Sequence, residues 1–250
     1  MFIKIINPNT TWSMTEKIGE CARAVAGPGT LVEAVSPSMG PVSIESHYDE
    51  ALSVPGVLQE IAVGELAGAD GYVIACFGDP GLDAAREIAR GPVVGIAEAG
   101  LRAASFLGRG FSVITTLDRT RGRAWELAQR YGVQSLCRNV RACDVPVLEL
   151  DTDPQAKRLI LDECRRAIAA DGADAIVLGC AGMADLCGEL TETLGVPVVD
   201  GVAAATLFVQ SLVTMRLRTG DHAEFAAPNP KPYTGLLSDF GVGSASVRTI

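Results

Sequence analysis

The fold is decided by the stretch Gly68-Ala69-Asp70-Gly71-Tyr72-Val73-Ile74-Ala75-Cys76, because the chain repeats its pattern once. The second copy, Gly172-Ala173-Asp174-Ala175-Ile176-Val177-Leu178-Gly179-Cys180, begins 104 residues further on. Each copy consists of a Gly-Ala-Asp turn, an apolar run of strand type and a cysteine, and a glycine-bearing turn and a helical segment follow. A further strand brings the chain to Ile96 in the first half and to Asp200 in the second, each 20 residues after the cysteine. Equal internal spacing of this kind indicates a duplicated unit.

Apolar runs alternate with segments of helical periodicity along the chain, which is typical of an α/β protein with parallel sheets. Strands are predicted at Phe2–Ile6, Leu31–Val35, Tyr72–Ala75, Val93–Ile96, Phe111–Thr115, Leu136–Arg141, Ala175–Leu178 and Val196–Val199. Helices are predicted at Ser13–Val25, Val57–Ala67, Thr120–Tyr131 and Gln155–Ala169, with Asp153-Pro154 as N-cap and first helical residue of the last.

The repeat predicts an α/β fold of two pseudo-symmetric lobes, each a parallel four-stranded sheet flanked by helices. The active site is then expected in the cleft between them. Residues 1–97 together with about 206–250 form the first lobe in this interpretation, and residues 98–205 form the second. The final helix, Val202–Met215, is expected to pack back on the first lobe.

The bulk composition excludes several classes of partner. The formal net charge is −9, whereas nucleic acids and anionic lipids both require clustered Lys and Arg. No run approaches the length of about 18 apolar residues that a membrane span needs. The N-terminal segment Met1-Phe2-Ile3-Lys4-Ile5-Ile6 alternates like a strand and lacks the regions of a signal peptide. We therefore expect a cytoplasmic protein that binds a small molecule, with no nucleic acid and no membrane.

Seven cysteines occur, at positions 21, 76, 137, 143, 164, 180 and 187. No CxxC pair is present and the two histidines are His47 and His222, so no metal site is predicted. No phosphate-binding glycine motif occurs in a strand–helix context, so no nucleotide cofactor is expected. A free thiol in a reducing compartment is by default a small buried apolar residue. The five cysteines without a repeat partner are given that role.

Cys76 and Cys180 differ from the other five because each is expected at the last residue of a strand, just before a helix, at the same place in the repeat. In parallel sheets the ligand lies beyond the carboxyl ends of the strands. If the lobes face one another with pseudo-twofold symmetry, one sulfur lies on each face of a bound molecule. One thiolate could then remove a proton from carbon while the other thiol delivers one from behind, which is the chemistry that inverts a stereocentre.

The residues around these cysteines fit such a role. Phe77-Gly78-Asp79-Pro80-Gly81 and Ala181-Gly182-Met183 let the backbone approach a ligand. Amides at the following helix N-termini can lower a thiol pKa from its usual value of about 8.5 and can hydrogen-bond an enolate oxygen. The Asp79 carboxylate would raise the pKa of Cys76 unless it points away as a helix cap, and the sequence leaves both alternatives open. His47 is interpreted as capping or decorating the helix that follows it.

Five motifs carry a resemblance to a known family. They are Ile6-Asn7-Pro8-Asn9-Thr10-Thr11, Gly40-Pro41-Val42-Ser43-Ile44-Glu45-Ser46, Cys76-Phe77-Gly78-Asp79-Pro80-Gly81, Ser112-Val113-Ile114-Thr115-Thr116 and Leu178-Gly179-Cys180-Ala181-Gly182-Met183. Together they resemble the hydantoin racemases, which belong to the aspartate/glutamate racemase superfamily and include allantoin racemases. The resemblance extends from the first strand to about Gly235.

The resemblance implies a two-lobed fold, no cofactor, a homo-oligomer, and two catalytic cysteines matching Cys76 and Cys180. It also implies a substrate pocket lined by Asn9, Ser43, Ile44, Thr115 and Thr116, with the backbone amides of Gly78 and Gly182. The positions agree with the predicted topology, because Asn9 and Thr115-Thr116 follow the first strand of each half. Neutral Asn, Ser and Thr side chains can pair with both the carbonyl acceptors and the N–H donors of a hydantoin ring.

The function implied is racemisation of 5-monosubstituted hydantoins by two-cysteine proton transfer at C5. An allantoin racemase of purine catabolism is the alternative, since allantoin is itself a 5-ureidohydantoin. A free amino acid fits less well, because Phe77 and Ala181 replace the Asn-Thr and Thr that follow the cysteines of amino-acid racemases. Further alternatives are a superfamily decarboxylase or isomerase, of which the decarboxylases typically keep one cysteine, and a non-catalytic small-molecule-binding protein.

Overall fold

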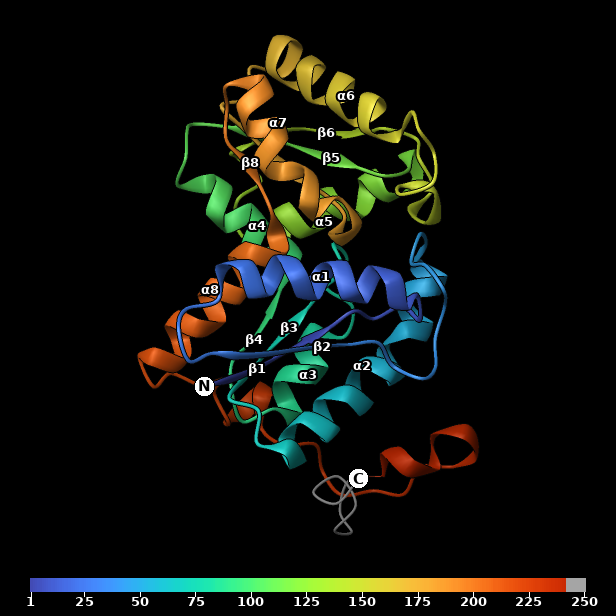
Figure 1. Ribbon diagram of the computed structural model, residues 1–250. Helices are drawn as coiled ribbons and strands as arrows, with labels where there is room; N and C mark the ends of the chain where they lie inside the picture. The colour runs from blue at the N-terminus through green and yellow to red at the C-terminus, as the bar shows by residue number, and fades with distance from the viewer. Residues whose placement is uncertain (242–250) are drawn as a thin grey trace.

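The structure, a computed structural model, describes residues 1–241. Figure 1 shows two α/β units, each with its own sheet, stacked one above the other. The first sheet has the strand order β2-β1-β3-β4, and all neighbouring pairs are parallel. Its strands are β1 (Phe2–Ile6), β2 (Leu31–Val35), β3 (Gly71–Ile74) and β4 (Val93–Gly95). The second sheet repeats this arrangement as β6-β5-β7-β8, again parallel. Its strands are β5 (Phe111–Thr115), β6 (Cys137–Ala142), β7 (Ala175–Leu178) and β8 (Val198–Val199).

Helices cover both faces of each sheet, as parallel sheets require. The helices are α1 (Trp12–Val25), α2 (His47–Ala67), α3 (Leu82–Ile88), α4 (Ile96–Ser105), α5 (Arg121–Arg130), α6 (Ala156–Asp171), α7 (Cys187–Leu194) and α8 (Gly201–Thr214). Short 3-10 turns occur at Asp118–Thr120, Val147–Glu149, Ala181–Leu186, Ala223–Phe225 and Gly235–Phe240. The predicted fold class, two parallel four-stranded sheets flanked by helices, is confirmed.

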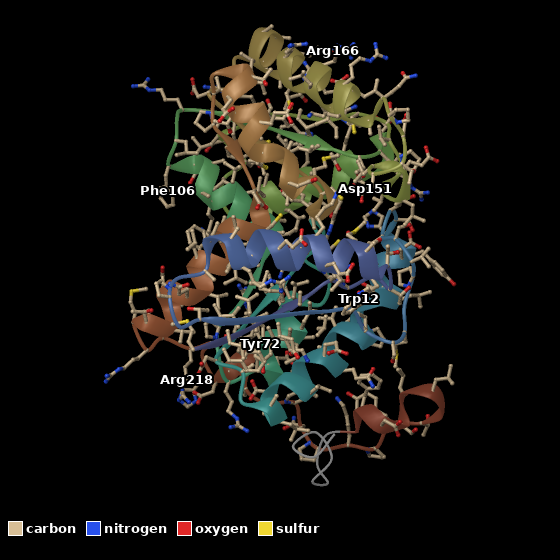
Figure 2. All side chains as sticks on the ribbon, viewed as in Figure 1. Trp12, Tyr72, Phe106, Asp151, Arg166 and Arg218 are labelled. Carbon is tan, nitrogen blue, oxygen red and sulfur yellow. The ribbon has the colours of Figure 1, made fainter. Side chains whose placement is uncertain are left out.

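Successive residues of the strands enter different cores, because side chains alternate across a sheet. Ile3 and Ile5 of β1 pack with α1 and α8, which lie between the two sheets in Figure 1. Tyr72 of β3 points to the opposite face, where it is fully buried and donates a hydrogen bond to Glu65 of α2 (2.8 Å; Figure 2). Val209 of α8 joins the core of the first sheet, so the predicted packing of the final helix on the first lobe is confirmed.

The lobe boundaries at residues 97/98 and 205/206 stay a prediction, and the last part of the predicted first lobe, 242–250, lies outside the described residues. Lys17 of α1 forms an ion pair with Asp151, which lies on the second-lobe side of this helix (Figure 2). Within residues 1–241, no helix has the length and apolar character needed to cross a membrane.

Two predicted helix starts are wrong. Helix α2 begins at His47, ten residues before the predicted start, because Ser46 accepts a hydrogen bond from the Asp49 amide (3.2 Å) and donates one to the Asp49 carboxylate (2.7 Å). Pro55 lies inside this helix without ending it. Helix α6 begins at Ala156 rather than at Pro154, because the Asp153 carboxylate accepts from the Gln155 amide (2.8 Å) in a turn that precedes the helix.

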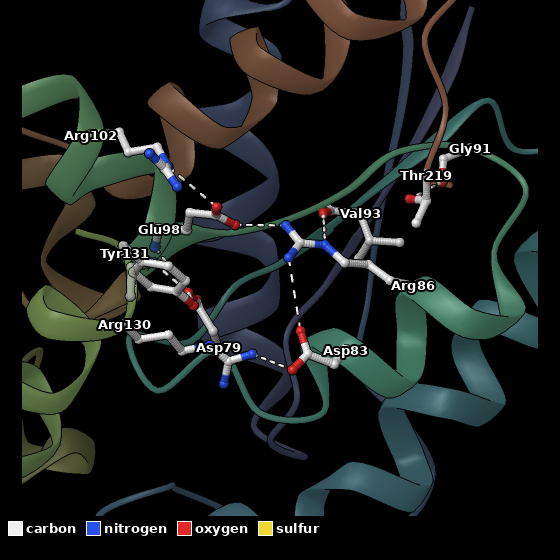
Figure 3. Close-up of polar contacts among 11 residues, drawn as sticks. Asp79, Asp83, Arg86, Gly91, Val93, Glu98, Arg102, Arg130, Tyr131 and Thr219 are labelled. Atoms are coloured by element: carbon white, nitrogen blue, oxygen red, sulfur yellow. Dashed lines mark hydrogen bonds and ion pairs between the residues drawn. The ribbon is translucent and has the colours of Figure 1, made fainter. Parts of the chain in front are cut away.

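Asp79 lies in the turn after Cys76 and caps α4, a helix that starts 17 residues further on. Its carboxylate accepts hydrogen bonds from the Ala97 amide (3.0 Å), the Glu98 amide (2.9 Å) and the Tyr131 hydroxyl (2.6 Å; Figure 3). The residue at the N-cap position of α4 is Gly95, which offers no side chain of its own. A Cβ there would lie 2.1 Å from the Asp79 Cγ, so the glycine makes room for a distant cap. The capping alternative for Asp79 is therefore the one that the fold adopts.

Replacing Asp79 with alanine should lower the free energy of unfolding by about 2 to 4 kcal/mol, because three buried donors lose their acceptor. Guanidinium unfolding measures this change. Asp83→Ala is the matched control: Asp83 is exposed and pairs with Arg86 and Arg130 at the surface, so its loss should cost less than about 0.5 kcal/mol. Equal effects of the two substitutions would contradict the capping role.

Candidate active site

A cavity of about 190 Å³ lies at the carboxyl ends of both sheets. Strand β3 ends at Ile74 and β7 at Leu178, and in each case the cysteine follows two residues later, just beyond the strand rather than at its last residue. Both Cys76 and Cys180 line the cavity, one from each sheet. Since parallel sheets leave their ligand sites at this edge, the topology brings the two thiols to a shared space.

Five of the predicted pocket residues line the cavity: Asn9, Ile44, Gly78, Thr115 and Thr116. Ser43 is absent from the lining, whereas Ser46 of the same loop is part of it. Gly182 is also absent, but it lies beside Cys180, since a Cβ on it would be 3.6 Å from the Cys180 sulfur. The binding roles of all seven residues stay predictions. The five in the lining are in a position to contact a ligand in the cavity.

Asn9 is held by a local network at the end of β1. Its side-chain oxygen accepts from the Asn7 amide group (2.9 Å) and from the Thr11 backbone amide (2.9 Å), and its own amide group approaches the Met14 sulfur at 3.3 Å. A thioether is a weak acceptor, so the Asn9 amide group retains donor capacity. The side chain is therefore fixed in place as a donor.

Thr115 is the last residue of β5 and faces the cavity from the second sheet. Its hydroxyl lies 2.7 Å from the Thr120 hydroxyl, which in turn donates to the Leu117 carbonyl (2.8 Å). Because the single Thr120 proton is used in that bond, Thr115 is the donor to Thr120 and keeps its lone pairs free as acceptors. One lobe thus presents a donor and the other an acceptor near the end of its first strand.

Sequence reasoning missed most of the charged residues of the cavity. Glu45, Glu50, Arg119 and Arg123 line it, as does His47, which had been interpreted only as a helix cap. The Glu45 carboxylate accepts from the Val147 amide (2.8 Å) and so joins the loop before α2 to the second lobe. The segment 45–50 overlaps the end of the family motif that covers residues 40–46, and this overlap was the available signal. Nothing in the helix periodicity of α5 marked Arg123.

Burial dominates the electrostatics of the two thiols. It raises the pKa of Cys180 to about 12 and that of Cys76 further, while hydrogen bonding to the amides of Gly182 and Gly78 acts in the opposite direction in each case. Negative charge on Cys180 also raises the pKa of Cys76, so the two sites interact. One proton is consequently held more readily between the pair than lost from both.

The Asp79 carboxylate has only a small effect on the pKa of Cys76, although it also caps α4. Burial raises the pKa of Asp79 to about 6, although its three hydrogen-bond donors favour the ionised form. Burial and the charges of Glu50 and Cys180 raise the pKa of Cys76 more than the charge of Asp79 does.

Among residues 1–241, no group of three or more His, Cys, Asp or Glu side chains could hold a metal ion.

Comparison with known proteins identifies the class. The profile of the Asp/Glu/Hydantoin racemase family matches residues 3–209. The chain is 47% identical to a hydantoin racemase of Pseudomonas sp. (strain NS671), over 99% of this chain and 100% of that protein. It is 50% identical to a hydantoin racemase of Rhizobium meliloti, over 94% and 98%. The chain belongs to the Asp/Glu/Hydantoin racemase family and is an enzyme of the isomerase class.

Solved structures agree with this assignment. An allantoin racemase from Klebsiella pneumoniae superposes with a TM-score of 0.95 at 48% identity, covering 97% of this chain and 100% of that one. Arylmalonate decarboxylase superposes with a TM-score of 0.62 at 21% identity, covering 85% of this chain and 92% of that one, which shows a shared fold alone.

The thiol environment predicts an unusual pH dependence of alkylation. An ordinary cysteine levels off in reactivity near pH 9, because its thiolate is then largely formed. Since burial raises both pKa values, the iodoacetamide rates of Cys76 and Cys180 should keep rising about tenfold per pH unit through about pH 9.5. Mass spectrometry of the separate peptides measures each rate. A plateau below pH 8.5 for both would be incompatible with this environment.

Proposed function

We propose that this protein racemises 5-monosubstituted hydantoins, with Cys76 and Cys180 as a two-base pair acting at C5. The observation that supports the proposal most directly is that two thiols, one from the edge of each parallel sheet, line one small cavity. Its volume of about 190 Å³ suits a single five-membered ring with a modest substituent. No other pair of like titratable residues occupies equivalent positions of the two repeats in the described lining.

The proposed reaction moves one proton in and one out. The thiolate of one cysteine takes the C5 proton, and the electron pair of the C–H bond passes to the C4 carbonyl, which becomes an enolate. The thiol of the other cysteine then delivers its proton to the opposite face of C5 as the carbonyl re-forms. The substrate leaves inverted, and the two cysteines have exchanged protonation states. Atoms and charge balance without a further reactant.

The surroundings of the thiols support each requirement of this scheme. Burial raises both pKa values, so both sulfurs are protonated at neutral pH, and the charge of Cys180 raises the pKa of Cys76 further. When one thiolate forms, the other sulfur therefore keeps its proton, which is the state that the reaction needs. The Asn9 donor and the Thr115 acceptor suit the carbonyl and N–H groups of a hydantoin ring. A buried enolate is stabilised by donors that are already oriented, and the backbone amides of Gly78 and Gly182 stand beside the two sulfurs.

Allantoin is the specific alternative substrate. It falls within the same class, because its C5 substituent is a ureido group, and the structural relative from Klebsiella pneumoniae is an allantoin racemase. The cavity favours a polar substituent, since Ser46, His47, Arg119 and Thr120 belong to its lining. A general hydantoin racemase would also accept an aromatic substituent, and the two alternatives are separated by experiment.

Single enantiomers of allantoin and of 5-benzylhydantoin should lose their circular-dichroism signal when the purified enzyme is added without metal or cofactor. The rate of decay should be well above that of an enzyme-free sample, and the circular-dichroism signal should end at zero. Faster decay of allantoin would assign the enzyme to allantoin, and faster decay of the benzyl compound to general hydantoins. If neither compound decays faster than its blank, the proposed function is wrong.

Cys76→Ala and Cys180→Ala should each reduce racemisation by at least about 10³-fold, because one of the two proton transfers is lost. Each variant should still exchange the C5 proton for deuterium in D₂O with one enantiomer only, and the two variants should differ in which one. Proton NMR of each enantiomer measures this exchange. Cys164→Ala, which removes a buried core thiol, is the control and should retain racemisation. Equal exchange of both enantiomers by either active-site variant would refute the two-base mechanism.

A further inference from the structure

Arg123 of α5 is the charged side chain that joins the second lobe to the turn after Cys76. Its Nη2 donates to the Gly78 carbonyl at 2.8 Å, and its Nε lies 3.3 Å from a carboxylate oxygen of Glu50 on α2. The side chains of Arg123 and Glu50 are 24% and 18% exposed, so the pair is largely shielded from water. The remaining partner of the guanidinium is Glu126, on its own helix.

The Glu50 carboxylate packs directly on the same turn. A Cβ on Gly78 would lie 2.3 Å from the Glu50 oxygen, so only a glycine admits the carboxylate at this distance. The carbonyl of Gly78 is therefore held by Arg123, and the amide of the same residue is turned to Cys76, whose thiol pKa it lowers by hydrogen bonding. One residue, through its two flanking peptide groups, thus links the guanidinium to the sulfur.

Cys180 has a different environment. In the described residues, no guanidinium hydrogen-bonds the turn after Cys180, and the cation that acts on its thiol is Lys17, which pairs with Asp151 and Asp185. The nearby carboxylate is Glu45, whose hydrogen bond is to a backbone amide and not to a cation. The two thiols occupy equivalent strand ends but differ in the charges beside them.

We propose that Arg123 and Glu50 are positioning residues for Cys76 alone: Arg123 holds the carbonyl of Gly78, whose own amide supports the Cys76 thiolate, and Glu50 opposes that thiolate. The pair makes the two thiols unequal in the resting enzyme, so that Cys76 keeps its proton and Cys180 is the thiolate that forms more readily. This inference deepens the proposed function, on which it rests in treating Cys76 as a reacting group.

The opposed charges give the two residues opposite effects. The charged groups that act on Cys76 are Glu50 from α2, Asp79 from its own turn and Cys180 across the cavity. Removing the Glu50 charge leaves Arg123 beside the turn and favours the Cys76 thiolate. Removing Arg123 leaves the Glu50 charge uncompensated and frees the Gly78 peptide, which disfavours it.

Two further charged groups affect the pKa of Glu50. His47 lies near Glu50 on α2 and stabilises its charge when protonated, whereas Glu126 on α5 raises the Glu50 pKa. Burial is the largest cause of the raised Glu50 pKa, and the Arg123 charge opposes it.

The test is the alkylation rate of Cys76 at pH 8, measured with iodoacetamide on the full chain and resolved from Cys180 by peptide mass spectrometry. Glu50→Gln should react about tenfold faster at Cys76 and Arg123→Met about tenfold slower, corresponding to about one pKa unit. The Glu50→Gln/Arg123→Met double variant should return to within about threefold of the wild type. Arg123→Lys keeps the positive charge but loses the planar guanidinium that can bind two partners at once. Its Cys76 alkylation rate should fall between those of Arg123→Met and the wild type.

Cys180 in the same samples is the internal control and should change by less than about threefold. Arg165→Met, on the exposed face of α6, controls for the loss of an arginine at the surface. Equal changes at both thiols, or faster reaction of Cys76 in Arg123→Met, would overturn the inference and indicate a purely structural role. Thermal unfolding of each variant establishes that it is folded.

The assay contains no substrate, so it fails separately from the proposed function. If Cys76→Ala still racemises hydantoins while the alkylation pattern holds, the two-base mechanism is wrong and the electrostatic inference survives. If both cysteines prove necessary but Glu50 and Arg123 leave Cys76 unchanged, the mechanism survives and this inference is wrong.

Discussion

Burial of both faces of two parallel sheets is the constraint on which the rest of the structure depends. Because helices cover each face, the carboxyl edges are the places where loops of both sheets can converge on a ligand. The chain directs both of these edges to one cavity, with α1 and α8 lying between the sheets (Figure 1). The position of Cys76 and Cys180 follows from this topology, and so does the mixture of lining residues from both halves of the chain.

The symmetry of the frame does not extend to its polar contacts. Helix α8 is capped by the residue directly before it, Asp200, whose carboxylate accepts from the Val202 amide at 2.7 Å. Helix α4 starts at the equivalent place in the first half but is capped by Asp79 from the turn after Cys76. Figure 3 shows that Glu98 of the same helix also binds Arg86 and Arg102. The turn after the first thiol thereby caps α4, whereas in residues 1–241 no side chain of the turn after Cys180 caps α8.

The sequence allowed the sheets to be predicted well because buried strands carry a local signal. The runs at Phe2–Ile6 and Phe111–Thr115 are apolar and β-rich, and the structure has strands with those bounds. The start of α2 was missed because Pro55 is an unfavourable residue inside a helix, whereas Ser46 and Asp49 favour an earlier start through side-chain hydrogen bonds. Propensity alone does not weigh these two effects against each other.

The site residues near strand ends could be predicted from the sequence. Those that reach the cavity from elsewhere in the fold, through tertiary contacts, could not. Thr115 ends the first strand of the second half and Asn9 lies three residues after the first strand of the first half, so topology places both at the cavity. Arg123 enters from an amphipathic helix whose sequence does not reveal which neighbouring turn it meets. Ser43 shows the opposite error, because a residue within a family motif lies outside the cavity lining.

The enclosure of the two thiols has a consequence for successive turnovers. Under the proposed mechanism, each event leaves the enzyme in the protonation state suited to the enantiomer just made, not to the one just consumed. The protein therefore carries a record of its last product until water reaches the cavity and resets it. With one enantiomer in large excess, this reset and not the chemistry on carbon would become the slow part of the cycle.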